Sequence, residues 1–203
     1  MNDKLVWIDC EMTGLSLTHD ALIEIAVLVT DFELEVLGPG IDLVVKPPQE
    51  ALDQMNEVVT RMHTASGLIT ELDAGLTLQD AQAQVLDHVR EYVKEPGKAP
   101  LAGNSVGTDR AFLARDMPEL ENWLHYRVID VSSIKELSRH WFPRAYFAAP
   151  SKAGHHRALT DIAESIEELR YYRGTVFREA PGIDTENARS VATAVDGSVS
   201  GHL

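Results

Sequence analysis

Apolar runs separated by polar turns dominate the first fifty residues of the chain. Residues 5–8 form a short apolar run, and residues 22–30 form a longer, nearly continuous one that is rich in β-branched side chains. Such runs are typical of strands that are buried on both faces of a sheet. A Gly-Pro-Gly turn at 38–40 precedes a further run at 41–45. We expect this third run to return as an antiparallel strand.

The apolar spacing changes after Thr77, where apolar residues begin to recur every three or four positions. This period predicts a helix with Thr77 as its N-cap and a stop at Pro96-Gly97. An amphipathic helix is also predicted around 159–169. The remaining predicted elements are strands at 100–103 and 127–131, helices at 108–115 and 132–141, and a loop at 143–154.

Three strands followed by alternating helices and short strands predict an α/β fold, with a mixed five-stranded sheet flanked by helices. A length of 203 residues suits one domain with one core. Beyond about residue 179 the apolar period stops, so we expect a domain over 1–178 and a flexible C-terminal tail over 179–203.

Composition narrows the class of protein. No apolar run approaches the roughly 18 residues of a membrane span, and the N-terminus shows no signal-peptide pattern. The single cysteine, Cys10, excludes an intrachain disulfide. We therefore expect a cytoplasmic protein with no membrane partner.

The formal charge of −14 argues against binding of long DNA or RNA, because phosphate contacts normally need a basic surface. Residues 110–157 are an exception, since eight basic and five acidic side chains give them a net charge of +3. A chance arrangement of helix-surface charges would also produce this segment.

Asp9 and Glu11 form the first candidate for chemistry. Residues i and i+2 of a strand point to one face, so both carboxylates would project together from the end of the first strand. Two adjacent carboxylates repel each other unless a proton or a cation offsets them, and hard divalent cations prefer oxygen ligands. Three D-x-E pairs occur in the chain, but only this one follows an apolar run and precedes a glycine loop.

Two further segments offer polar groups at the ends of predicted elements. Ser105 and Asp109 lie where a strand passes through a small-residue turn into a helix, and helix capping would also explain Asp109. His156 and Asp161 lie at the start of the last helix; His156 alone could be a surface or capping histidine. Together the three segments supply four carboxylates and a histidine. These are the groups needed for two-metal phosphodiester hydrolysis, with the histidine as general base.

The motifs also resemble a known family. Asp9/Glu11, Asp109 and His156-x4-Asp161 match, in order, the three motifs of the DEDD 3′→5′ exonucleases of the histidine subtype. Longer sequence motifs of this chain resemble those of the oligoribonuclease family: IDCEMTGL, HTASGL, GNSVGTDRAFL, DVSSIKEL and HRALTDI. The similarity extends from about residue 5 to residue 177.

The resemblance implies an RNase H-like fold, two Mg²⁺ or Mn²⁺ ions per site, and a homodimer. It implies release of 5′-mononucleotides, in the 3′→5′ direction, from RNA a few nucleotides long, including dinucleotides. The metal ligands carried over by position are Asp9, Glu11, Asp109 and Asp161, with His156 as the general base. The substrate-binding residues carried over are Leu15 as a wedge against a base, Ser105, Arg127 and Ser132 on the terminal 5′-phosphate, and Tyr126 reaching the neighbouring protomer's site.

One departure from the family concerns the base site. Some members carry a stacking Trp shortly before HTASGL, where this chain has Val58, and apolar contact there could weaken base binding. Cys10, Trp7 and Tyr92 are expected in the core, and the aromatic segment 141–147 is expected at a subunit interface. His155 and His156 have no accompanying Cys or His spacing for structural zinc. Two alternatives stay open, a 3′→5′ exonuclease for longer substrates and a metal-dependent nucleotide-binding module without turnover.

Overall fold

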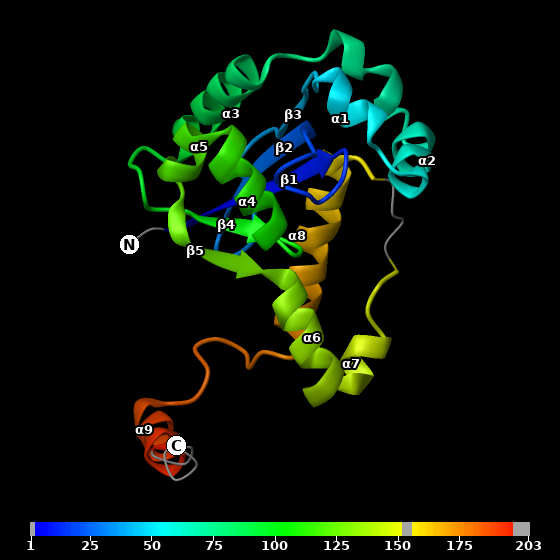
Figure 1. Ribbon diagram of the computed structural model, residues 1–203. Coiled ribbons are helices and arrows are strands. Elements are labelled where there is room, and N and C mark those ends of the chain that lie inside the picture. Colours follow the sequence, from blue (N-terminus) through cyan, green and yellow to red (C-terminus); the bar gives the residue numbers. More distant parts are fainter. Residues whose placement is uncertain (1–2, 152–155, 197–203) are drawn as a thin grey trace.

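A five-stranded sheet forms the centre of the computed structural model, which describes residues 3–151 and 156–196 (Figure 1). The strands are β1 (Lys4–Met12), β2 (Leu22–Asp31), β3 (Ile41–Val44), β4 (Pro100–Gly103) and β5 (His125–Asp130). Their order is β3-β2-β1-β4-β5. β1 and β2 are antiparallel, as are β2 and β3, whereas β4 runs parallel to both β1 and β5. This confirms the predicted mixed sheet.

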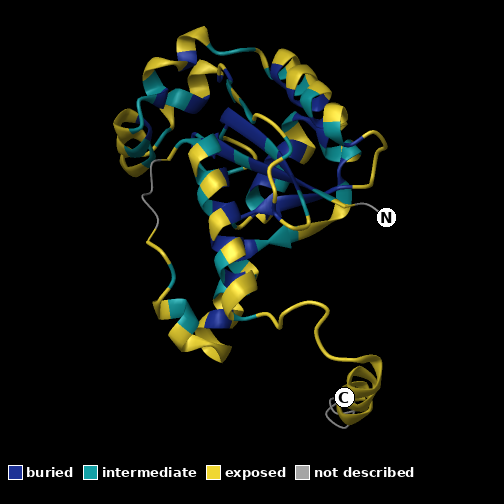
Figure 2. Ribbon diagram, turned by 180° about the vertical axis from the view of Figure 1, so that it is seen from behind, coloured by how far each residue is buried: buried dark blue, intermediate teal, exposed yellow. Residues whose placement is uncertain are grey.

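Helices cover both faces of the sheet. In the described part of the chain they are α1 (Gln49–Asp53), α2 (Glu57–Ala65), η1 (Leu68–Thr70), η2 (Leu72–Ala74), α3 (Leu78–Tyr92), α4 (Gly107–Asp116), α5 (Pro118–Trp123), α6 (Val131–Trp141), α7 (Pro143–Phe147), α8 (Ala158–Thr175) and α9 (Thr185–Val195). Helices α3, α4 and α5 pack on one face, and α6 and α8 pack on the other. Strands β1, β2 and β4 are largely buried between these helices, whereas the edge strands β3 and β5 are partly exposed (Figure 2).

The central strand β1 explains how the sheet positions polar groups. Val6, Ile8 and Cys10 belong to the core on the α3 side, and Trp7 belongs to the core on the α8 side. Since side chains alternate along a strand, Asp9 projects to the α8 side with Trp7. Cys10 is buried and Trp7 is wholly buried, as predicted.

Several short helices were not predicted. Residues 49–74 form α1, α2, η1 and η2, and α7 occupies part of the segment that was predicted to be a loop at 143–154. That prediction was wrong for Pro143–Phe147, because Pro143 at the first helical position favours a helix start; residues 152–155 lie outside the described residues.

The C-terminal segment also contains a helix. α9 begins after Asp184, whose side chain accepts a hydrogen bond from the backbone N–H of Asn187. None of the residues of α9 is buried, and Figures 1 and 2 show it apart from the sheet. The division at residue 178 stays a prediction. Among the described residues, no helix combines the length and apolarity that crossing a bilayer requires.

Candidate functional site

The predicted catalytic residues come from four places in the fold that meet at the end of β1. Asp9 and Glu11 lie on β1, Asp109 lies in the first turn of α4, and Asp161 lies in the first turn of α8. His156 precedes α8 by two residues and is exposed. Segments that are a hundred residues apart in sequence therefore share one end of the sheet.

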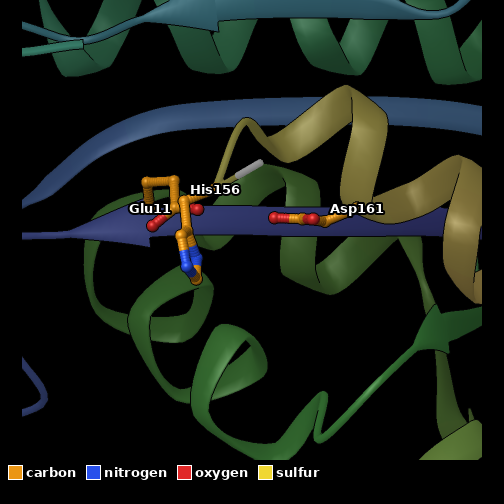
Figure 3. Close-up of side chains that lie close together, drawn as sticks. All are labelled: Glu11, His156 and Asp161. Carbon is orange, nitrogen blue, oxygen red and sulfur yellow. The ribbon is translucent and has the colours of Figure 1, made fainter. Parts of the chain in front are cut away.

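Glu11, His156 and Asp161 form the tightest group. Each offers one potential ligand atom, and these atoms all lie within 4.8 Å of one another (Figure 3). In Figure 3 the side chains of Glu11 and His156 are adjacent, and Asp161 extends toward them from α8. Two carboxylate oxygens and an imidazole nitrogen at this spacing fit a hard divalent cation with a nearby base.

Asp109 joins the group through the backbone. Its Oδ1 atom accepts a hydrogen bond from the N–H of Cys10 at 3.0 Å, between the two carboxylates of β1. Asp109 is buried, although carboxylates are seldom fully buried without a partner. Helix α4 is thereby fixed with its first turn against the end of β1.

The carboxylates raise one another's pKa. Burial, followed by the charges of Asp109 and Glu11, raises the pKa of Asp9 to about 9. Burial and then the charge of Asp161 raise the pKa of Glu11 to about 8. Burial raises the pKa of Asp109 to about 6. Without cations, the site therefore cannot keep all of these carboxylates ionised at neutral pH. Bound divalent cations would offset the negative charge.

His63 is a site residue to which the sequence pattern assigned no role. It lies on α2, is wholly buried, and its Nε2 atom is 2.9 Å from the backbone oxygen of Met12. Its Nδ1 atom lies 3.9 Å from Oε2 of Glu11 and has no hydrogen-bond partner among the described residues. Burial lowers the pKa of His63, which favours the neutral imidazole. His63 belongs to the motif HTASGL, and only this motif could have indicated from the sequence that it lies at the site.

The residues predicted to hold a terminal phosphate lie near β4 and β5: Ser105 follows β4, Arg127 lies within β5, and Ser132 lies at the start of α6. The Oγ atoms of Ser105 and Ser132 are 3.0 Å apart. Oδ1 of Asp130 accepts hydrogen bonds from the backbone N–H groups of both serines. Arg127 is exposed on β5, with its guanidinium 5.0 Å from the ring centroid of Tyr126. The structure therefore brings the two serines together and leaves Arg127 accessible.

Leu15 and Val58 are both largely exposed. Leu15 is 76 % exposed on the turn after β1, and Val58 is 65 % exposed on α2. Asp20 holds the Leu15 turn, because its carboxylate accepts hydrogen bonds from Thr13 Oγ1 and from the N–H of Ser16. Leu15 is thus exposed on a fixed turn, and its contact with a base stays a prediction.

Comparisons with known proteins identify the family of the chain. The RNase T family model, described as an exonuclease, matches residues 6–169. The chain is 69 % identical over 192 residues to an oligoribonuclease of Streptomyces avermitilis, covering 95 % of this chain and 96 % of that protein. It is 58 % identical to an oligoribonuclease of Cutibacterium acnes, covering 97 % of this chain and 98 % of that protein.

Solved structures support the fold. The fold matches that of a zinc-bound Escherichia coli exonuclease I in complex with single-stranded DNA, at a TM-score of 0.64 and 16 % identity. The match covers 86 % of this chain and 41 % of that longer one. An exonuclease I from Methylocaldum szegediense matches at a TM-score of 0.57 and 21 % identity, over 86 % of this chain and 41 % of the other. From the family model and the curated relatives, the chain belongs to the oligoribonucleases of the exonuclease family, which confirms the predicted enzyme class, a 3′→5′ exoribonuclease.

Proposed function

We propose that the protein hydrolyses very short RNA, including dinucleotides, from the 3′ end to nucleoside 5′-monophosphates by two-metal-ion catalysis. The observation that carries the proposal is the convergence of Glu11, His156 and Asp161 within 4.8 Å, from segments distant in sequence. Membership of the oligoribonuclease family supports the same reaction.

In this mechanism Asp9, Glu11, Asp109 and Asp161 would hold two Mg²⁺ or Mn²⁺ ions. When bound, the ions offset phosphate charge and lower the pKa of water. His156 accepts the proton from the attacking water, since a histidine can act as a base near neutral pH. The 3′ oxygen of the shortened RNA leaves with the electron pair of the broken P–O bond and takes up a proton from solvent to become the 3′-hydroxyl group.

The substrate-binding residues would select for length. Ser105, Arg127 and Ser132 hold the terminal 5′-phosphate, while Leu15 packs against a base. A protein of charge −14 can bind RNA this way because only one or two phosphates need positive partners. Affinity should therefore depend weakly on salt concentration, with a slope that reflects one or two released counterions.

We also propose a cytoplasmic homodimer in which Tyr126 reaches the partner's site. Exposed apolar side chains on α6 and α7 support a dimer, notably Trp141 at 67 % exposed and Phe147 at 81 %. Exposed apolar clusters of this kind commonly mark interfaces. The absence of any disulfide partner for the buried Cys10 suits a reducing compartment.

A substrate-length series tests the proposal. Labelled 5′-phosphorylated RNAs from two to twenty nucleotides are incubated with Mg²⁺, and release of mononucleotide is measured. The dinucleotide should be degraded faster than the twenty-nucleotide RNA, and EDTA should stop release. If the long RNA is degraded as fast as the dinucleotide or faster, the protein is instead a 3′→5′ exonuclease that acts on longer substrates. Binding of dinucleotide with no release would favour the module without turnover.

A further inference from the structure

Arg157, the residue directly after His156, is held by two carboxylates from other elements. Its Nε atom is 2.7 Å from Oε1 of Glu24 on β2. Its Nη1 atom is 2.8 Å from Oε1 of Glu71, which lies between η1 and η2. Both partners are far from Arg157 in sequence, so these contacts fix its position relative to the sheet.

Glu24 is an unusual residue for the interior of a strand. Its side chain is wholly buried, and β2 places it directly opposite Glu11 of β1. A buried carboxylate needs compensation, and here both oxygens have partners. Oε1 accepts from Arg157, and Oε2 accepts from the backbone N–H of Ala158 at 3.1 Å.

The bond to Ala158 makes Glu24 the cap of α8. Arg157 occupies the N-cap position of that helix and gives it no side-chain cap hydrogen bond. The first N–H groups of a helix need acceptors and interact favourably with negative charge. Glu24, on the neighbouring strand β2, supplies both the hydrogen-bond acceptor and the negative charge. The start of α8, which carries Asp161, is therefore attached to the sheet.

His156 has a backbone conformation that needs support. Its φ angle is 51°, in the left-handed region, which a residue with a Cβ atom adopts only when its surroundings impose it. On its C-terminal side, the next two residues are the ones that bind Glu24.

We propose that Arg157, held by Glu24 and Glu71, is the positioning residue of His156. The ion pairs set the direction in which the chain enters α8, and so place the imidazole next to Glu11 and Asp161. Arg157 acts through His156 and contacts neither the cations nor the RNA. This inference rests on the proposed function, in which His156 is the general base.

The same contacts join two parts of the site. Glu71 closely follows α2, which carries Val58 and His63. Arg157 thereby links the segment after α2 to the start of α8, with Glu24 of the sheet between them. A change at Arg157 should therefore disturb the base more than the ligands on β1, which have their own support in the sheet.

The test compares Arg157→Gln with Arg157→Lys in the full-length protein. Arg173→Gln is the matched control, because Arg173 lies at the other end of α8 and pairs with Glu33, away from the site. For each protein we would measure kcat and KM on a 5′-phosphorylated dinucleotide, and Mn²⁺ affinity by calorimetry. Each arginine change is also made in the His156→Ala background.

Arg157→Gln should lower kcat by on the order of 10²-fold, the loss associated with misplacing a catalytic group by about 1 Å. KM and Mn²⁺ affinity should change less than threefold, and Arg157→Lys should recover part of kcat because it keeps the charge but not the two-sided contact. In the His156→Ala background, Arg157→Gln should cause no further loss, as expected for residues that act as a unit.

Two results would overturn the inference. One is a kcat for Arg157→Gln that equals that of Arg173→Gln. The other is an undiminished loss in the His156→Ala background, which would mean that Arg157 acts independently of the base. Failure of the proposed function looks different, because the unmodified protein would then release no mononucleotide from a dinucleotide.

Discussion

Oδ1 of Asp109 accepts a hydrogen bond from the backbone N–H of Cys10 at 3.0 Å, and this bond joins the first turn of α4 to the end of β1. The residue thus has two separable roles, a structural one as acceptor and a chemical one as a negative charge. Asn keeps the acceptor and removes the charge, whereas Ala removes both.

Asp109→Asn should therefore abolish turnover while leaving the free energy of unfolding nearly unchanged. Asp109→Ala should abolish turnover and also destabilise the protein by about 1–3 kcal/mol, because it leaves the buried N–H of Cys10 unpaired. Urea denaturation of the metal-free proteins measures the difference. Equal stability of the two variants would mean that the Cys10 hydrogen bond contributes nothing.

The stability of the metal-free protein should fall as pH rises from about 5 to about 9. The pKa of Asp9 is raised to about 9 and that of Glu11 to about 8, so the folded state binds more protons than the unfolded state in this window. Their contribution to stability is complete at low pH and is lost as each group ionises in the folded protein. Thermal unfolding in EDTA across this range measures the trend.

Asp9→Asn should flatten that pH dependence, because it removes the group with the highest pKa of the three. Added Mn²⁺ should stabilise the unmodified protein more at pH 8 than at pH 6, since the ligands must be deprotonated to bind it. A stability that rises with pH in EDTA would contradict the raised pKa values.

Removal of the base and removal of a metal ligand should be distinguishable. His156→Ala should lower kcat by about 10²–10⁴-fold, the usual contribution of general-base catalysis, with Mn²⁺ affinity nearly unchanged. Asp161→Asn should weaken Mn²⁺ binding and abolish turnover. Calorimetry and single-turnover kinetics separate the two effects, and unchanged activity of His156→Ala would remove it from the mechanism.

Val58→Trp should strengthen binding of RNA. Position 58 is 65 % exposed on α2, so an indole can be accommodated without disturbing the core. Stacking of a base on an aromatic side chain contributes about 1–3 kcal/mol, which would lower KM for a dinucleotide about tenfold. Val36→Trp, at an exposed position after β2, is the control. Equal KM values for the two variants would place Val58 outside the base site.

Trp141→Asp should dissociate the proposed dimer and reduce activity, because Trp141 is exposed on α6 in the cluster proposed to form the interface. Val191→Asp on α9 is the matched control, since it also places a charge at an exposed apolar position. Light scattering measures the mass of each protein. A monomeric unmodified protein with full activity would contradict the proposed dimer.

The positions of the strands along the chain were predictable, because burial leaves a clear pattern of apolar residues. Residues 22–30 read as a buried strand and form most of β2 (Leu22–Asp31), and Thr77 caps α3 as expected. Residues 49–74 were not predicted, because their helices are only one to three turns long and owe their position to packing. The local sequence contributes little to the stability of helices this short.

The site was predictable only in part for a related reason. Carboxylates at strand and helix ends gave Asp9, Glu11, Asp109 and Asp161, which the structure brings to one end of the sheet. His63 comes from α2 and depends wholly on tertiary packing. Glu24 did leave a signal, since it is the lone charge within the apolar stretch 22–30, and a charge buried in a strand needs a partner. Its partner, Arg157, is 133 positions away and could not be identified from spacing.

The position of β1 between two hydrogen-bonded neighbours determines whether activity or the folded sheet should be lost first on heating. At Val6 and Trp7, β1 is paired on both sides and covered on both faces, so it opens there only when the whole molecule unfolds, and these amide hydrogens should exchange slowly with solvent. His156 lies outside the sheet and is exposed ahead of α8, so it lacks this cover. Mild heating should thus inactivate the enzyme before the sheet melts, and cooling should restore activity from a sheet that stayed folded.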